Sequence, residues 1–464
     1  MKKTTIVASV FLLLTSCASL TATTYQRPDL DMPFFWREGA GATTARPSDG
    51  QASLSDDKWW EQFADAKLNR LVETAMPVNL DLAQAALTLR QARLRADVAA
   101  ADLWPTLSAD GGFDANHRYG SEGGSDKSFS AGIGISYEAD LFGRLSSARN
   151  AAVWRAEATA FDLEATRLSL QATLVSQYFR LAALREESRL SASSIDYARK
   201  TLALARAQYA AGAVGRLETL EAERSLASQL ASHESIRQNE MSIRQTLALL
   251  FGQAPEQVRL EEPGDIRRAA IPEITPGLPA DILARRPDLA AAETRLRAAL
   301  ADADSARISL YPRLTLTGSF GGSNEELSRA LADPIASFGA GLILPFVDWR
   351  RLRRNVAISE TEYHLAIIDF RQSLYQALSE VETCLSAAEK LKNQGEQTET
   401  MLDAARRGEA LYAIQYRAGA TPLQSWLDAQ ERRRQAETSL IENKLARLIN
   451  QVDMAKALGG GKAR

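Results

Sequence analysis

Cysteine and histidine are scarce in this chain of 464 residues, which has two cysteines and three histidines. Two thiols build no disulfide framework, and His117, His233 and His364 lack the spacing of a metal site. Cys384 lies in a helical stretch and is expected to be a small core residue. The net charge of −3 lacks the positive excess of a nucleic-acid-binding protein. With no catalytic constellation either, the sequence predicts no enzyme, no metal, no cofactor and no nucleic-acid partner.

Long apolar runs are also missing beyond residues 6–14, so no transmembrane helix is predicted in the mature chain. That run follows Lys2 and Lys3 and ends in Leu-Thr-Ser before Cys17, which is the layout of a signal peptide. It resembles a bacterial lipoprotein signal, which implies a signal peptide at 1–16, a covalent lipid on Cys17 and, because Ala18 follows, sorting to the outer membrane. The alternative is ordinary cleavage nearby, for example after Ala22.

One stretch of the chain occurs twice at a constant offset. Pro105 has its counterpart at Pro312, 207 residues further on (312 − 105), and the motif Gln-Tyr-x-Ala-Gly-Ala begins at Gln208 and again at Gln415. A constant offset indicates two copies of one structural unit. We therefore expect a lipid tether and N-terminal segment at 17–65, a first repeat at 66–252, a linker at 253–280 and a second repeat at 281–464.

Strict alternation marks part of the first repeat. From 129 to 141 the odd-numbered residues are apolar or aromatic, whereas the even-numbered ones are serine, glycine, glutamate or aspartate. This period of two predicts a strand long enough to cross a bilayer when tilted, with one face towards lipid and one towards water. A strand of a soluble sandwich would alternate in a similar way. A weaker strand precedes it, and the second copy repeats the pattern, so we expect strand hairpins at 106–141 and 313–345.

Proline is absent from residues 144–211, where leucines recur at coiled-coil spacing. A periodic pattern of this length signals a coiled coil or a helical array. The helical stretches 66–103 and 217–250 together match its length, so we expect them to stack end to end beside it. The second repeat has the same arrangement in 281–310, 350–418 and 423–458.

Aromatic residues stand at the four junctions between strands and helices. We interpret them as an aromatic belt at a membrane surface, and packing at domain corners is the alternative. They are Trp104, Phe142, Tyr311 and Trp349. The arginine-rich run 350–354 follows the last of them, and we interpret it as anchoring the start of a helix near the membrane rather than as binding a ligand.

Four membrane strands cannot close a barrel, because single-chain outer-membrane barrels have at least eight. Unpaired strand edges are untenable in lipid, so the chain must form an oligomer. A dimer would give eight strands and an interior filled by side chains, so we favour a homotrimer. The predicted fold is mainly α with membrane β: a trimeric barrel of four strands per chain, continued by a long α-helical coiled-coil barrel.

Several short motifs carry a family resemblance. They are Trp59-Trp60-x-x-Phe63, Trp104-Pro105, Asp140-Leu141-Phe142-Gly143-Arg144, Arg286-Pro287-Asp288 with Ala292-Glu293, and two Tyr-x-x-Gly turns. Together they resemble the outer-membrane efflux proteins of the TolC-like superfamily, in the NodT-like branch of lipoproteins that serve RND-type pumps. The resemblance covers essentially the whole chain. It implies a trimeric tunnel that is lipid-anchored in the outer membrane, with its helices in the periplasm, docked on a periplasmic adaptor protein and an inner-membrane pump.

The resemblance also assigns roles to the two turns between helices. Adaptor contacts are implied at Tyr209, Gly212, Gly215, Gly419 and Pro422. An aperture that holds the tunnel shut is implied at Tyr416, Thr421, Ser425 and Asp428. Thr421 and Ser425 replace the arginine and aspartate of TolC itself, so its particular lock is not implied here. A ring of three Asp428 side chains would attract cations and repel itself, which suits a gate. The alternatives are glycines that merely allow a tight reversal, and a solvated helix aspartate.

The predicted function is the passive exit duct of a tripartite efflux system for small molecules such as drugs. A duct for secreted polypeptides is one alternative. A lipid-anchored coiled-coil scaffold without a pore is another, although a scaffold needs no strands with one polar and one apolar face.

Overall fold

The computed structural model describes residues 23–30, 32–34, 36–37, 58–117, 119, 125–254, 256–274, 277 and 279–460. Cys17, the predicted signal peptide and most of the predicted tether lie outside the described residues. The chain divides into two compact units. Unit 1 is Met1–Leu30, Leu87–Asp162 and Asp288–Ser373, and unit 2 is Asp31–Ala86, Leu163–Pro287 and Leu374–Arg464. Each unit therefore draws on both sequence repeats.

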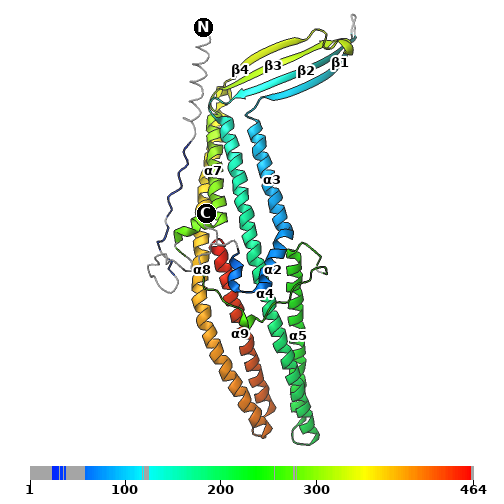
Figure 1. Cartoon of the computed structure of the whole chain (residues 1–464), viewed down its shortest axis with the longest axis vertical. Coiled ribbons are helices and arrows are strands. Elements are labelled where there is room, and N and C mark those ends of the chain that lie inside the picture. Colours follow the sequence, from blue (N-terminus) through cyan, green and yellow to red (C-terminus); the bar gives the residue numbers. More distant parts are fainter. Residues whose placement is uncertain are drawn as a thin grey trace. The chain divides into compact units, whose positions relative to one another are not determined.

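Unit 1 contains one antiparallel sheet of four strands in the order β1-β2-β3-β4 (Figure 1). The strands are β1 (Thr106–His117), β2 (Ser125–Ala139), β3 (Arg313–Asn324) and β4 (Ile335–Ile343). Both predicted hairpins are thus confirmed, and β2 of the first pairs with β3 of the second. Within the described chain, the outer edges of β1 and β4 have no partner strand.

The register of the sheet brings the alternating patterns of its strands into phase. Ile133 pairs with Phe320, whereas its neighbour Gly134 pairs with Ser319. Ser319 in turn pairs with Ser337, and their hydroxyls lie 2.6 Å apart. Because directly paired residues share a face, one face of the sheet carries most of the Phe, Ile and Leu, whereas the other carries mainly Ser, Thr and Gly, with charged residues such as Asp110, Glu138 and Arg313 among them. The expectation of one apolar and one small, polar face is confirmed.

Long helices make up most of the remaining chain, as the proline-free stretches predict. They are α2 (Ala66–Ala75), α3 (Leu80–Ala101), α4 (Arg144–Ala210), α5 (Arg216–Leu250), α6 (Ile282–Arg285), α7 (Pro287–Ile308), α8 (Trp349–Arg417) and α9 (Leu423–Ala457). Short 3₁₀ turns are η2 (Trp59–Phe63), η3 (Met76–Val78), η4 (Ile266–Arg268), η5 (Pro279–Asp281), η6 (Leu327–Arg329) and η7 (Pro345–Asp348). Among the described residues, no helix combines the length and the apolar character that crossing a bilayer requires.

One predicted helix is interrupted. The pattern at 281–310 predicted a continuous helix, but α6 ends at Arg285 and α7 begins at Pro287. Arg286 between them is extended, with φ −79° and ψ 120°. The proline ring excludes the helical conformation from the residue before it, and that local constraint overrides the apolar periodicity.

The core of unit 2 is aromatic where η2 packs on α4. Trp59 and Phe63 are almost completely buried, and the Phe63 ring lies 5.0 Å from the Phe179 ring of α4. The Trp59 indole N–H donates to Gln171 Oε1 at 3.3 Å, so its one polar atom is satisfied. Cys384 is also buried, which confirms it as a core residue, and burial raises the pKa of its thiol to about 11.

The two repeats use the same helix junction. Asn79 Nδ2 donates to the carbonyl of Leu250 at 2.8 Å, and 207 residues further on Arg286 Nη1 donates to the carbonyl of Ala457 at 3.0 Å. In each repeat, a side chain at the start of one short helix therefore satisfies a carbonyl at the end of the other. Both contacts lie within unit 2 and are equivalent in the two copies, whereas the expected end-to-end stacking of the whole short helices stays a prediction.

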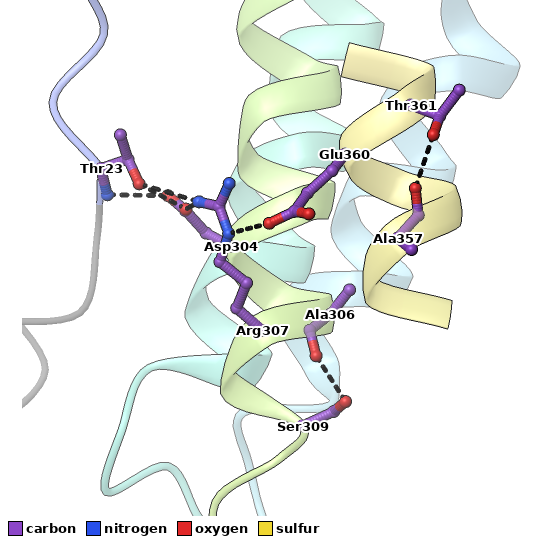
Figure 2. A network of polar contacts seen from close by, with 8 residues as sticks. All are labelled: Thr23, Asp304, Ala306, Arg307, Ser309, Ala357, Glu360 and Thr361. Carbon is purple, nitrogen blue, oxygen red and sulfur yellow. Dashed lines mark hydrogen bonds and ion pairs between the residues drawn. The ribbon is translucent and has the colours of Figure 1, made fainter. Parts of the chain in front are cut away.

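An extended segment, residues 23–30, is fixed to α7 in unit 1. Thr23 donates to Asp304 from both its backbone N–H (2.8 Å) and its hydroxyl (2.7 Å). Figure 2 shows that Arg307 extends this network, since it donates to Asp304 at 3.0 Å and to Glu360 of α8 at 2.9 Å. We call residues 23–30 the N-terminal strap.

Glycine is required where the short helices meet. Gly252 and Gly459 have φ of 62° and 86°, in the left-handed region that L side chains rarely adopt. A Cβ on Gly252 would lie 2.7 Å from the Val78 carbonyl oxygen, and one on Gly459 would lie 2.5 Å from that of Arg285.

We expect Gly459→Ala to lower the free energy of unfolding by about 1–3 kcal/mol, because the alanine adds left-handed strain and a contact with backbone. Gly264→Ala is the matched control, since nothing lies within 4 Å of the added Cβ there. Denaturant unfolding of both variants checks this. Equal free energies of unfolding for Gly459→Ala and Gly264→Ala would contradict the requirement for glycine at this junction.

Candidate functional site

Two turns between long helices form the ends of the helical hairpins in unit 2 (Figure 1). At the first, Gly212 N–H donates to the carbonyl of Tyr209 and Ala213 N–H to that of Gln208, both at 2.9 Å. At the second, the equivalent N–H groups of residues 419 and 420 donate to the carbonyls of residues 416 and 415, at 3.0 and 2.9 Å. Each turn is therefore a Schellman motif, in which a glycine at C′ lets the helix end and the chain reverse.

Glycine conformation explains why the same motif occurs twice. Gly212 and Gly419 have φ of 74° and 71°. Each long helix ends here because that left-handed residue cannot continue it. The next helices begin after Gly215 and Pro422, which are both extended. Neither helix start has a side-chain hydrogen bond from its N-cap residue. The predicted adaptor-contact residues thus lie in or beside the two turns, and their adaptor role stays a prediction.

Tyr416 ties the second turn to the first. Its side chain is 4% exposed, and its hydroxyl lies 2.6 Å from Gln208 Oε1 and 3.2 Å from Glu218 Oε2. Gln208 lies near the end of α4 and Glu218 in the first turn of α5. The single phenolic proton is donated to one acceptor at a time. The link therefore crosses from the α8–α9 hairpin to the α4–α5 hairpin within one chain.

Burial fixes the protonation state of this link. Desolvation, followed by the negative charge of Glu218, raises the pKa of Tyr416 to about 12. A folded-state pKa above the ordinary value of about 10 means that the contact is intact below pH 10. It is lost as the pH rises through about 12. At neutral pH the hydroxyl is therefore a hydrogen-bond donor.

An aromatic and acidic cluster supports Tyr416. Its ring stacks on Trp426 with centroids 5.2 Å apart, and Tyr197 meets the same indole edge-on at 5.9 Å. Glu409 accepts from the Tyr197 hydroxyl at 2.7 Å and from the Trp426 indole N–H at 3.2 Å. Leu423 is fully buried beside them. The cluster holds three helices together immediately behind the turns.

The other predicted aperture residues lie outside this link. Asp428 is exposed and accepts a hydrogen bond from Gln424, one turn earlier in α9, at 2.6 Å. Thr421 and Ser425 are half-buried, and within the described chain no hydrogen bond of either side chain occurs. A ring of Asp428 side chains requires other copies of the chain, so its gate role stays a prediction.

Sequence reasoning missed the partners of Tyr416. Gln208, Glu218 and Glu409 read as ordinary polar helix residues, because what brings them together is the packing of hairpins distant in sequence. One signal was present. Trp426 stands on the same apolar face as Leu423 and Leu427, where a buried tryptophan needs a partner for its indole N–H.

The four predicted interface aromatics lie beside the sheet in unit 1. Phe142 and Tyr311 stack with ring centroids 4.9 Å apart, directly after β2 and directly before β3. Trp104 precedes β1 and is 73% exposed, and Trp349 opens α8 and is 43% exposed. Exposed tryptophans next to an apolar sheet face are typical of a membrane interface. Their contact with lipid stays a prediction.

Comparison with known proteins identifies relatives along nearly the whole chain. The model of the outer membrane efflux protein family matches residues 71–253 and again residues 278–460. The two matches are 207 residues apart at both ends (278 − 71 and 460 − 253), which confirms the internal duplication.

The relatives are outer-membrane proteins. The chain is 33% identical over 436 residues to the pyoverdine export outer membrane protein OpmQ of Pseudomonas putida, with 91% of this chain and 92% of that protein covered. It is 31% identical over 466 residues to OpmQ of Pseudomonas aeruginosa, with coverage of 98% and 96%. The solved outer-membrane channel OprN is 27% identical, with a TM-score of 0.82 over 95% of this chain and 99% of that one.

We expect Tyr416→Phe to loosen the link between the turns by about 1–2 kcal/mol, because it removes the hydroxyl and keeps the stacking on Trp426. Conductance in planar bilayers should rise. Tyr209→Phe is the matched control, since Tyr209 is the equivalent residue of the first repeat and is 48% exposed. Asp428→Ala, measured beside them, tests the predicted carboxylate ring. Conductance that is equal in Tyr416→Phe and the unaltered protein would contradict the link.

Proposed function

Because this chain belongs to the outer membrane efflux protein family, we propose that three copies of it close one duct through which small molecules leave the cell. As a member of this family, the chain is an efflux channel of the outer membrane. The trimer, the lumen, the lipid anchor, the partners and the cargo are what we propose. The open edges of the sheet are the observation that carries the proposal.

Edge strands require partners in a membrane. In the described chain, β1 is hydrogen-bonded only to β2 and β4 only to β3, so one side of each presents free N–H and C=O groups. Lipid offers no hydrogen bonds to these groups. All three pairings are antiparallel, so β4 runs opposite to β1. The β4 edge of one copy therefore fits the β1 edge of the next, and this head-to-tail contact repeats until a ring closes.

The helices attached to these edges carry exposed apolar stripes in unit 1. On α3, which leads into β1, Leu87, Leu94 and Val98 are 63%, 55% and 66% exposed. On α8, which follows β4, the stripe is Ile358, Leu365 and Ile368, with exposures of 55%, 54% and 58%. Steps of seven, four and three residues are those of a coiled-coil seam. The stripes fit the same neighbouring copies that would pair the strands.

Unit 2 shows the same feature near the turns. Leu217 and Leu220 of α5 are 68% and 49% exposed, and Leu411 and Ile414 of α8 are 61% and 63% exposed. Apolar side chains at this spacing on a helix favour burial against another helix. The proposed seam between copies therefore extends along the helical hairpins as well as the sheet.

The polar face of the sheet favours three copies over two. Eight strands give a barrel whose interior is just wide enough for side chains to fill. Serine, glycine and threonine dominate this face and are too small to fill such an interior, and the charged Asp110, Glu138 and Arg313 on the same face favour water around them. Three copies give four strands each, and a ring of twelve leaves a lumen that small polar side chains line.

The N-terminal strap supports a lipid anchor on Cys17. Thr23 is held at Asp304, close to the end of α7, and α7 leads through Tyr311 into β3. Thr23 is six positions after Cys17 (23 − 17), and six residues reach at most about 20 Å. A lipid on Cys17 would therefore lie within that distance of Thr23, beside the end of α7 that leads into the sheet.

The exposed turns suit an adaptor protein, and the cargo is small. A Cβ placed on Gly212, Gly215 or Gly419 would have no atom within 4 Å, so the backbone of both turns is open to a partner. We propose that a periplasmic adaptor docks there and connects the duct to an inner-membrane pump. OpmQ is named for pyoverdine export, which favours small molecules of that kind as cargo.

We expect Leu94→Glu to abolish the trimer, because the seam would bury an unpaired carboxylate at a cost of several kcal/mol. The monomer should still fold, since the side chain is more than half exposed in the single chain. Arg93→Glu is the control on the neighbouring face of α3. Native mass and heat-modifiable migration of outer-membrane extracts check this. A trimer unaffected by Leu94→Glu would refute the seam.

Removal of the proposed lipid site gives a separate test. We expect Cys17→Ala to abolish labelling with a radioactive fatty acid but to leave a trimer, because the contacts that build the ring lie in the sheet and helices. Unchanged labelling would refute the anchor at Cys17, and loss of the trimer would show that the ring depends on it.

A further inference from the structure

The start of α8 combines exposed apolar residues with a cluster of arginines. Phe346 and Val347 of η7 are 66% and 88% exposed, and Trp349 follows with 43% exposed. Four arginines then occupy the first turn and a half of α8, all of them exposed. They are Arg350, Arg351, Arg353 and Arg354. Exposed apolar residues followed directly by basic residues at the start of a helix are typical of a segment that lies at a membrane surface.

These charges have little compensation within the chain. Arg351 pairs with Asp348, but among the described residues no carboxylate lies within ion-pair distance of Arg350, Arg353 or Arg354. The N-terminus of a helix carries the positive end of its macrodipole, so cations in the first turn are unfavourable there. The described residues therefore leave most of the positive charge of this cluster open to an anionic ligand.

The equivalent helix start in the first repeat is compensated. Asp140 caps α4, since it accepts the backbone N–H groups of Leu145 and Ser146 at 3.0 and 2.8 Å. Arg144, the counterpart of Arg351, pairs with Glu138 at 2.8 Å. The first copy satisfies its helix start with its own carboxylates.

The second copy has lost those groups and gained cations. At the offset of 207, Asp140 is replaced by Val347 and Glu138 by Pro345. Gly143, Ser146 and Ser147 are replaced by Arg350, Arg353 and Arg354. Helix formation alone requires no such change, because α4 begins well without it.

A pocket lies among the arginines. It has a volume of about 890 Å³ and is lined by Trp349, the four arginines and Ala357. Guanidinium groups match phosphate oxygens in geometry and charge, and they are often bidentate. An indole beside them provides an apolar surface for the glycerol and upper acyl region of a lipid.

We propose that the start of α8 is a binding site for the phosphate of an anionic glycerophospholipid in the membrane that surrounds the sheet. The proposal rests on the proposed function, because it needs the sheet to lie in a bilayer. Phe346, Val347 and Trp349 enter the apolar region, and the arginines hold the headgroup phosphate at its surface. The first repeat lacks the site, so each chain binds one such headgroup.

The test uses the purified full-length protein in neutral detergent, titrated with phosphatidylglycerol and, separately, with phosphatidylcholine. Native mass spectrometry counts retained lipids and reports the mass of the assembly in the same spectrum. We expect at least tenfold tighter retention of phosphatidylglycerol. A basic residue near an anionic lipid surface contributes roughly fivefold in affinity. The triple variant Arg350→Gln, Arg353→Gln, Arg354→Gln should therefore weaken retention by about a hundredfold.

Two further variants sharpen the result. Arg216→Gln, Arg224→Gln, Arg237→Gln removes three exposed arginines from α5 and should leave retention unchanged. Val347→Asp restores the carboxylate found at the equivalent position of the first repeat, at a residue exposed enough to accept it. It should also weaken retention, because the helix start gains its own counter-charge.

Equal retention of the two lipids, or no loss in the arginine triple variant, would overturn the site. Binding of inorganic phosphate with neither lipid retained would show an anion site without a lipid, and tighter retention of lipid A would assign the site to the other source of lipid phosphate. Each of these outcomes contradicts the proposal. If the unaltered protein has the mass of a monomer, the proposed trimer fails, whatever lipid it retains.

Discussion

The unpaired edges of β1 and β4 are the constraint on which the rest of this structure depends. A sheet whose apolar face lies in lipid cannot leave backbone N–H and C=O groups free, because the bilayer core offers them no partner. The described part of the chain has four strands, too few to close a barrel, and we therefore propose that the partners come from copies of the same chain. The exposed stripes on α3 and α8 stand on the same two edges, which makes strand pairing and helix packing consequences of one association.

The two repeats share the same helix junctions and turns, but their side chains differ at some equivalent positions. The junctions of Asn79 with Leu250 and of Arg286 with Ala457 retain the same backbone contact although the side chain differs. Tyr209 and Tyr416 occupy equivalent places, yet the first is half exposed and the second is buried against Gln208. A difference between two copies in one chain separates what the fold requires from what was added to it.

Much of the architecture could be predicted from the sequence because it depends on local periodicity. The alternation at 129–141 specified a strand and its two faces, and the absence of proline from 144–211 specified a long helix. The break at Arg286 escaped a reading based on periodicity, because the effect of Pro287 on its neighbour outweighed the pattern. The partners of Tyr416 could not be predicted, since Gln208 and Glu218 approach it only through tertiary packing. The proposed ring of Asp428 is still harder to predict from the sequence, because it depends on contacts between chains.

Disulfide trapping across the proposed seam is the most direct test of a ring of three chains. One cysteine is placed in β1, at Ser108 or Asp110, and one in β4, at Ser337 or Gly339, in a chain that carries Cys384→Ala. Oxidation in intact outer membranes should then link β4 of one copy to β1 of the next. For a ring of three chains we expect a covalent ladder that ends at three chains in a non-reducing gel. A ladder that ends at two chains, or bonds formed only within single chains, would contradict it.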